Sequence, residues 1–484
     1  MPDSLPADMP YPLLVNALTG LPLPPVSLDT LSALASNGPA PHDRGPNILG
    51  VDPDAVADAN DLTQAGWGII FASDADPAIQ AQLQPLIDLR RSQVKDPLLC
   101  KVFSGSTGVQ PGQTAASWAQ QRGVSLDTPV DPSRGLPYYL LIVGSPDRIS
   151  FEFQAALKSQ WAVGRLHFDN LEDYGRYARA VVQYEDPSFT PAQSKSSAIW
   201  VTRNPGDLAT AMLSGAVLQD FLPPGVPLGS KKGFLLNAFV NEKATKSQLI
   251  EILRGNVPGG APAVIFTGCH GCDYTGADSD TQRRLQGSFL TQEWVPKTPA
   301  NSSNQFSADD IPADAKLLGT VGFLFACFSG ACPAENSYYF NQDGSPVKIS
   351  PQPMIARLPQ VLLSRGMLAA IAHIDLAFPY AFQDVNGTPQ MEAVRSPLQQ
   401  IMVGRRTGLA ADILTSIWNT RAANLGILQG AARPALATPA QSAGAAAPSP
   451  AVKAVARMTI ARDDARNYIV LGDPATQLRV RDMK

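Results

Sequence analysis

The stretches APAVIFTG (261–268) and TVGFLFA (320–326) decide the predicted fold of this chain. Each is a short apolar run, and such runs are typical of parallel strands that are buried on both faces of a sheet. His270 lies just beyond the end of the first run, and Cys327 just beyond the end of the second. Because parallel strands present their carboxyl ends at one edge of a sheet, we expect the two side chains to share that edge.

Strand-like runs also occur on both sides of this pair, and helical patterns separate them. They are WGIIFAS (67–73), LLCKVFS (98–104), PYYLLIVGS (137–145), WAVGRLHF (161–168), SAIWVTR (197–203), GFLLNAFV (233–240), GMLAAIAH (366–373) and RNYIVLGDPATQLRV (466–480). Strands that alternate with helices in this way predict an α/β fold with mostly parallel sheets.

The alternation restarts near residue 191, so the sequence predicts two α/β units in tandem, 61–190 and 191–484. Residues 1–60 are rich in Pro, Asp and Ala and are expected to form an irregular N-terminal arm with one short helix. The Ala/Pro/Ser-rich stretch 431–455 offers little apolar surface to bury. We therefore expect it to be a mobile insertion within the second unit.

Composition and charge exclude several classes of protein. The formal net charge is −4 and no Lys/Arg run stands out, which argues against a nucleic-acid partner. No apolar run reaches the roughly 18 residues of a membrane span, and the N-terminus lacks the basic start and apolar core of a secretory signal. A cytoplasmic protein is expected, the alternative being a mature form whose leader has been removed. The 5 cysteines, an odd and sparse set, argue against a disulfide framework.

A Cys and a His at one sheet edge suit acyl transfer. Cys327, as a thiolate, would attack a peptide carbonyl, while His270 would raise the thiolate fraction and later protonate the leaving amine. Backbone N–H groups near Gly271 and Cys327 would bind the developing oxyanion. Gly271 and Ala326 are small neighbours of the reactive pair, which lets a substrate backbone approach closely.

Two other interpretations of the cysteines were weighed. A lone Cys at a strand end is commonly a small buried apolar residue, but the joint His–Gly and Ala–Cys pattern favours catalysis. Cys269, Cys272, Cys327 and Cys332 together offer the four sulfurs of a zinc site. The first pair encloses His270, however, and the second pair has an unusual spacing, so no metal is expected there.

Several sequence blocks, kept in order, resemble the gingipain-type cysteine peptidases of the caspase-like clan over most of residues 135–480. They are YYLLIVGSPDRISFEF, VGRLHFDNLEDYGRYARAVVQYED, FTGCHG, FLFACFSG, MLAAIAHIDLAFPYAF and YIVLGDPATQLRV. The His also precedes the Cys by about the 50 residues of the caspase signature. The resemblance implies a caspase-like three-layer sandwich of two α/β subdomains, with His270 and Cys327 as the catalytic dyad of the second.

The resemblance also suggests a specificity residue. In arginine-specific members, an acidic residue early in the helix after the first strand of the second subdomain lines the primary specificity pocket. Asp207 is the nearest match by position, and its carboxylate would pair with a basic substrate side chain. Alternatively, Asp207 simply caps its helix. The family's acid that assists the His has no clear counterpart, so the third catalytic residue stays open.

The expected function is that of a cysteine endopeptidase, acting after basic residues on protein or peptide substrates in a bacterial regulatory or defence pathway, with a regulatory partner. The alternative is a catalytically silent binding or scaffold protein of the same fold.

No resident cofactor is expected, although some members of the family use calcium. Asp278 and Asp280 would be its ligands, or they only solvate their loop. His373, near Asp375, would flank the cleft or be a core histidine, and Trp294 would wall the cleft or only pack.

Overall fold

The computed structural model describes residues 10–37, 50–385, 387–436 and 449–483. A ten-stranded sheet forms its centre, in the order β4-β3-β5-β6-β19-β18-β13-β9-β7-β8. Its strands are β3 (Trp67–Phe71), β4 (Cys100–Phe103), β5 (Tyr139–Val143), β6 (Ala162–Leu166), β7 (Ser194–Val201), β8 (Leu235–Val240), β9 (Pro262–Gly268), β13 (Val321–Phe325), β18 (Ala369–His373) and β19 (Tyr468–Gly472). These correspond to the runs predicted from the sequence.

The sheet consists of two parallel sets that meet in the middle. The pairs within β4-β3-β5-β6-β19 are parallel, and so are the pairs within β18-β13-β9-β7-β8. The two sets join through the antiparallel pair β18–β19. The predicted α/β class with a large, mostly parallel sheet is confirmed. The predicted boundary at residue 190 falls between the two sets, although β19 joins the sheet beside β6 of the first set.

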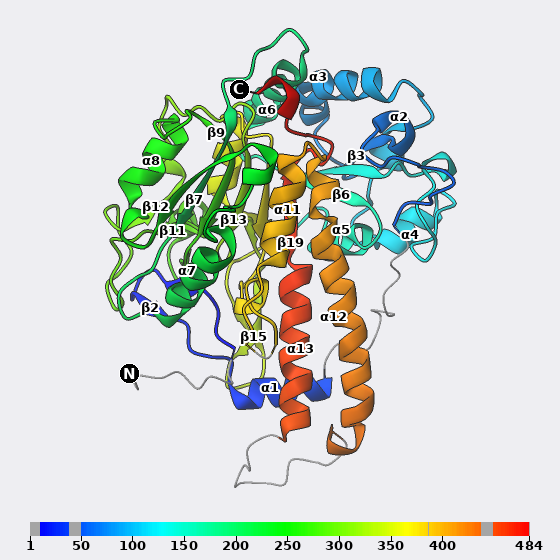
Figure 1. Ribbon diagram of the computed structural model, residues 1–484. Coiled ribbons are helices and arrows are strands. Elements are labelled where there is room, and N and C mark those ends of the chain that lie inside the picture. Colours follow the sequence, from blue (N-terminus) through cyan, green and yellow to red (C-terminus); the bar gives the residue numbers. More distant parts are fainter. Residues whose placement is uncertain (1–9, 38–49, 386, 437–448, 484) are drawn as a thin grey trace.

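Helices surround this sheet. They are α2 (Leu62–Ala65), α3 (Pro77–Val94), α4 (Ala115–Gln120), α5 (Phe151–Lys158), α6 (Leu171–Glu185), α7 (Leu208–Phe221), α8 (Lys246–Arg254), α9 (Ser279–Leu285), α10 (Arg357–Ser364), α11 (Glu392–Met402), α12 (Thr407–Leu436) and α13 (Pro450–Arg466). Helices α11, α12 and α13 lie in front of the sheet in Figure 1, while α3 and α6 pack against each other at its upper edge. Within the described ranges, no helix combines the length and apolarity needed to cross a membrane.

The expected insertion over 431–455 differs from the structure at both of its ends. Helix α12 continues to Leu436, and α13 begins at Pro450 after Ser449, whose side chain accepts a hydrogen bond from the Val452 N–H. Alanine is the strongest helix former and Pro fits the first helical turn, so local propensity is satisfied here by helix. Residues 437–448 lie outside the described residues.

A smaller sheet and two short strand pairs complete the fold. The smaller sheet has the order β12-β11-β10-β1-β2 and is formed by β1 (Leu14–Asn16), β2 (Leu21–Pro22), β10 (Gly271–Asp273), β11 (Phe289–Leu290) and β12 (Gln305–Phe306). The short pairs are β14 (Ala331–Cys332) with β17 (Met354–Ile355), and β15 (Glu335–Phe340) with β16 (Pro346–Lys348).

The N-terminal region is more regular than its composition indicated. The one expected helix is present as α1 (Leu28–Asn37), which packs against α13. Strands β1 and β2 were not expected, and the irregular prediction for 1–60 is wrong there. Strands of two or three residues leave no periodic pattern to detect. Residues 1–9 and 38–49 lie outside the described part of the chain.

A buried ion network ties α3 and α6 to β3 and to the end of β19, within the first parallel set. The Arg90 guanidinium on α3 donates to both carboxylate oxygens of Glu185 on α6, at 2.6 and 2.8 Å, and to Asp473 after β19, at 2.7 Å. Asp473 also accepts from the Trp67 indole N–H at 3.0 Å. Because Arg90 and Asp473 are fully buried, each charge depends on its partners for the solvation that water would otherwise give.

Replacing Arg90 by Ala should therefore lower the free energy of unfolding by about 3–5 kcal/mol, since it leaves buried carboxylates uncompensated. Urea denaturation followed by circular dichroism measures the change. The matched control is Arg91→Ala, because Arg91 forms an exposed pair with Asp88 and should cost less than about 1 kcal/mol. Equal effects of the two substitutions would contradict this role of the network.

Candidate active site

The predicted shared edge of His270 and Cys327 follows from the pairing of β9 with β13. Gly268, the last residue of β9, lies opposite Phe325, the last residue of β13. The Cys269 N–H then donates to the Phe325 carbonyl at 3.1 Å. His270 and Cys327 are each two residues beyond these ends, so the structure brings the two predicted residues to neighbouring loops.

Gly271 allows the two loops to approach. A Cβ on Gly271 would lie 2.0 Å from the carbonyl oxygen of Cys327, well inside van der Waals contact. Only glycine fits this position without a backbone shift. The predicted oxyanion donor therefore lies directly against the backbone of the predicted nucleophile.

Asp207 contacts the histidine directly. Its Oδ2 lies 2.9 Å from His270 Nε2, and both side chains are buried. Its other oxygen, Oδ1, accepts a hydrogen bond from the Thr210 N–H at 2.7 Å, so Asp207 also caps α7. The capping interpretation is confirmed. The contact with His270 was not predicted. Its only signal in the sequence is that Asp207 follows β7, the neighbour of β9.

Charge and burial act against each other on this pair. Burial alone would raise the pKa of Asp207, but the His270 charge and the hydrogen bonds from His270 and Thr210 outweigh it and lower the pKa to about 2. Burial likewise disfavours the His270 cation, yet Asp207, with a smaller contribution from the Leu13 backbone, raises the pKa of His270 above its usual value. The pair therefore favours the imidazolium form.

The rest of the His270 ring is enclosed. Its ring packs edge-on against Trp294, with 5.8 Å between the ring centroids, as one of the two interpretations of Trp294 expected. Among the described residues, Nδ1 of His270 has no hydrogen-bond partner. Since Nε2 is held by Asp207, Nδ1 is the ring atom available to exchange a proton with a thiol or a substrate.

The Cys327 thiol is fully buried. Its Sγ accepts a hydrogen bond from the Ala377 N–H at 3.0 Å and lies 3.6 Å from the Ala377 carbonyl. Burial raises the pKa of this thiol well above its usual value. Within the described ranges, its hydrogen bonds are thus with Ala377 and not with His270, so this conformation holds a protonated thiol.

The residue after Cys327 is strained. Phe328 has φ +56°, in the left-handed region that bulky side chains rarely adopt. Its N–H donates to the Asp375 carbonyl at 3.1 Å, which helps to hold this turn. Strain of this kind collects at functional sites because the surrounding contacts must maintain it. The local sequence FACFSG contains no signal that predicts a left-handed backbone at Phe328.

The other candidate residues lie apart from the dyad or serve structural roles. His373 is fully buried and its ring nitrogens contact the backbone carbonyls of Asp375 and Asp464 at 2.8 and 3.1 Å, as for a core histidine. Asp278 caps α9 through Thr281. In the part of the chain that the structure describes, no three His, Cys, Asp or Glu side chains are grouped to hold a metal ion.

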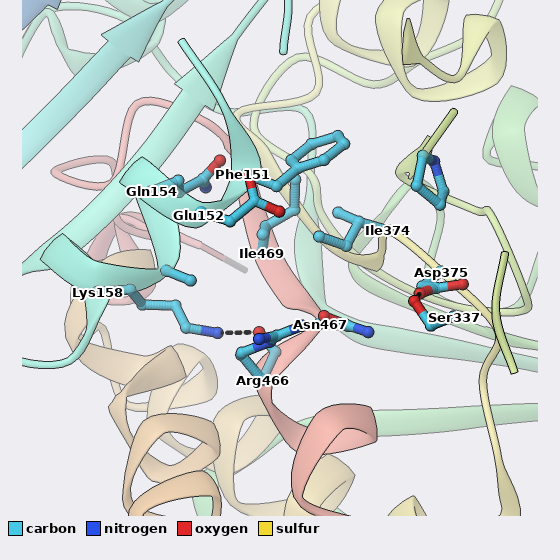
Figure 2. Close-up of a pocket in the computed structure, with 12 residues that line it drawn as sticks. Phe151, Glu152, Gln154, Lys158, Ser337, Ile374, Asp375, Arg466, Asn467 and Ile469 are labelled. Carbon is cyan, nitrogen blue, oxygen red and sulfur yellow. Dashed lines mark hydrogen bonds between the residues drawn. The ribbon is translucent and has the colours of Figure 1, made fainter. Parts of the chain in front are cut away.

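A small pocket of about 80 Å³ lies near the loop that holds Cys327, between Lys158 on one side and Asp375 with Ser337 on the other (Figure 2). The Lys158 ammonium donates to the carbonyls of Arg466 and Tyr468, so its hydrogen bonds are directed at the protein backbone. The pocket has room for a few waters but not for a peptide.

An open hollow adjoins the histidine side of the site. Asp207 and Leu208 line it from the start of α7, and Arg203, Glu242 and Gln292 line it from neighbouring loops. Among the described residues, no hydrogen bond or ion pair engages the exposed Glu242 carboxylate, whereas both oxygens of Asp207 are occupied. The hollow therefore places the Glu242 carboxylate in open space near Asp207, the partner of His270.

No family model matches the chain, and no curated protein matches it. Among solved structures, one titled as a protease aligns with 10% identity and a TM-score of 0.45, covering 86% of this chain and 78% of the other. The complex of Porphyromonas gingivalis RgpB pro- and mature domains aligns with 9% identity and a TM-score of 0.42, covering 86% and 80%. The Saccharomyces cerevisiae separase–securin complex aligns with 12% identity and a TM-score of 0.30, covering 70% and 16%. These are likenesses of overall structure at low sequence identity.

The pairing of Asp207 with His270 predicts a defined pH response. Asp207 is ionised above its lowered pKa and His270 is protonated below its raised pKa, so the ion pair contributes its full stabilisation between about pH 4 and pH 6.5. In Asp207→Asn, burial is unopposed and the pKa of His270 should fall below its ordinary value. A titration of the His ring signals by NMR, with His270→Gln to assign the peak, measures this shift. An unchanged His270 titration would exclude Asp207 as its charge partner.

Proposed function

We propose that this chain is a cysteine endopeptidase in which Asp207 orients His270 and His270 activates Cys327. The observation that carries the proposal is the 2.9 Å contact between Asp207 Oδ2 and His270 Nε2. His270 follows β9, and β9 pairs with β13, the strand that precedes Cys327. A base held by an acid beside a nucleophile is the arrangement that acyl transfer requires.

The reaction would proceed through an acyl-enzyme. With His270 neutral and protonated only on the Nε2 that faces Asp207, the Cys327 thiol gives its proton to Nδ1, and the sulfur forms a bond to the substrate carbonyl carbon. The Gly271 N–H stabilises the negative oxygen of the tetrahedral intermediate. His270 then returns the proton to the leaving amine as the peptide C–N bond breaks. Water, with His270 as its base, releases the acyl group and restores the thiol.

The acid has an electrostatic as well as an orienting role. Because Asp207 raises the pKa of His270, an imidazolium is available beside the sulfur when the two side chains meet. A neighbouring cation lowers the pKa of a thiol and stabilises the thiolate. Removing the carboxylate would therefore weaken both the orientation of the base and the ionisation of Cys327.

We further propose that the enzyme cleaves after basic residues. The exposed Glu242 carboxylate in the hollow beside the dyad supports this preference, together with the nearby Asp207. A carboxylate and a substrate guanidinium form a strong, charge-assisted pair. Since Asp207 already serves His270 and Thr210, Glu242 is the better placed of the two acids to contact a substrate charge.

A silent binding protein is the second candidate, and one observation favours it. The Cys327 thiol is buried, and its hydrogen bonds are with Ala377. A protein that binds peptides without cutting them would leave both Cys327 and the bound peptide unmodified. Chemistry at the sulfur thus separates the two candidates.

A panel of fluorogenic peptides with Arg, Lys, Asp or Leu before the scissile bond tests the proposal. Arg and Lys peptides should be cleaved, and Cys327→Ala should abolish cleavage because the proposed nucleophile is lost. Asp207→Asn should lower kcat by roughly 10²–10⁴-fold. Cleavage that persists in Cys327→Ala would rule out this nucleophile.

Substituting Glu242 tests specificity separately from chemistry. Glu242→Gln should lower kcat/KM for the Arg peptide by about tenfold or more, since a charge-assisted hydrogen bond is lost. The Leu peptide serves as the internal control, because its side chain has no charge to pair. Equal losses for the two peptides would remove Glu242 from the specificity site.

A further inference from the structure

Residues 10–26, called the arm below, cross the two loops that hold His270 and Cys327. The Leu13 N–H donates to the Ala377 carbonyl at 2.9 Å, and the Leu13 carbonyl accepts from the Gly271 N–H at 3.1 Å. Ala377 is also the residue that binds the Cys327 sulfur. The backbone of Leu13 therefore bridges Gly271, which follows His270, and Ala377, which binds Cys327. An extended peptide would use the same main-chain N–H and carbonyl groups.

The arm continues as a strand of the smaller sheet. In β1, Leu14, Val15 and Asn16 pair in parallel with Gly271, Cys272 and Asp273 of β10. The side chains of Leu13, Leu14 and Val15 are no more than 1% exposed. Adding a strand to a free sheet edge is a common way to bind an extended peptide, because main-chain hydrogen bonds supply affinity.

The same segment also packs on the side of the site that holds His270. Val15 belongs to the same apolar cluster as Trp294, which packs on the His270 ring. Tyr11 donates a hydrogen bond to the Met212 sulfur at 2.8 Å. Burial, with a smaller contribution from Asp207, raises the pKa of Tyr11 to about 12, which places the tyrosine near the acid of the site.

Further contacts hold the arm in place beyond β1. The Ala300 N–H donates to the Ala17 carbonyl and the Lys297 N–H to the Gly20 carbonyl, each at 2.8 Å. With the arm in this position, His270 and Cys327 are 1% and 0% exposed, so a substrate carbonyl cannot touch the sulfur in this conformation.

We propose that β1 is a built-in occupant of the substrate channel, and that a substrate binds as an extended strand along β10 once the arm has moved aside. This rests on the proposed peptidase function. The Gly271 N–H and the Ala377 carbonyl, now paired with Leu13, become the main-chain contacts of the substrate. Small or apolar substrate side chains take the buried positions of Leu14 and Val15.

The substitution Leu14→Asp tests this in the full-length chain. A carboxylate at this buried position disfavours the docked arm, while the matched control Leu21→Asp places the same charge on β2, where Leu21 is 44% exposed. We measure the iodoacetamide alkylation rate of Cys327 by mass spectrometry, with the half-buried Cys100 as the internal reference. Alkylation should rise at least tenfold in Leu14→Asp and stay unchanged in Leu21→Asp.

A second, milder variant guards against simple misfolding. Leu13→Pro removes the N–H that binds Ala377 without adding a charge, and should raise alkylation by a smaller factor with an unchanged circular dichroism spectrum. A peptide copying residues 10–17 should then protect Cys327 of the Leu14→Asp chain from alkylation. Folded variants in which Cys327 stays as slow as in the original chain would overturn the proposal.

The two readouts separate this inference from the proposed function. Faster alkylation of Cys327 without any peptide cleavage would support the arm as a cover and count against the peptidase. Cleavage at the same rate in the original chain and in Leu14→Asp would support the peptidase and remove the arm from the channel. Joint increases in alkylation and cleavage are the result that we expect.

Discussion

The parallel pairing of β9 with β13 is the constraint on which the candidate site depends. Its register sets Gly268 opposite Phe325, and from there each chain has two residues before its functional side chain. A slip of one residue would turn His270 or Cys327 to the other face of the sheet, because side chains alternate along a strand. The backbone of Gly271 packs directly against that of Cys327, so a side chain at position 271 would force the two loops apart.

Burial gives the charges of this protein their importance. On α3, Arg90 is fully enclosed and needs both Glu185 and Asp473. At the site, Asp207 and His270 meet in the same way, but with a histidine whose proton can move. The same physical rule, that a buried charge requires a partner, thus stabilises the fold in one place and sets the protonation of His270 in the other.

The arm and the dyad have opposing requirements. The fold gains from burying Leu13, Leu14 and Val15 against the catalytic loops, since apolar surface removed from water stabilises the folded state. The proposed catalysis requires those same loops to be exposed to a substrate. In that proposal, the main-chain groups of Gly271 and Ala377, now bound to Leu13, bind the substrate once the arm has moved.

The α/β class, the strands of the central sheet, the shared edge of His270 and Cys327, and the helix cap at Asp207 could all be predicted from the sequence alone. Each rests on local patterns, namely apolar runs, their alternation with helices, and a residue's place at the end of an element. Only the tertiary structure showed the contact of Asp207 with His270, the left-handed Phe328 and the path of β1 along β10. The first and the last of these features join segments that are far apart in the chain. The conformation of Phe328 is imposed by its neighbours in space. A local sequence pattern carries no information about either.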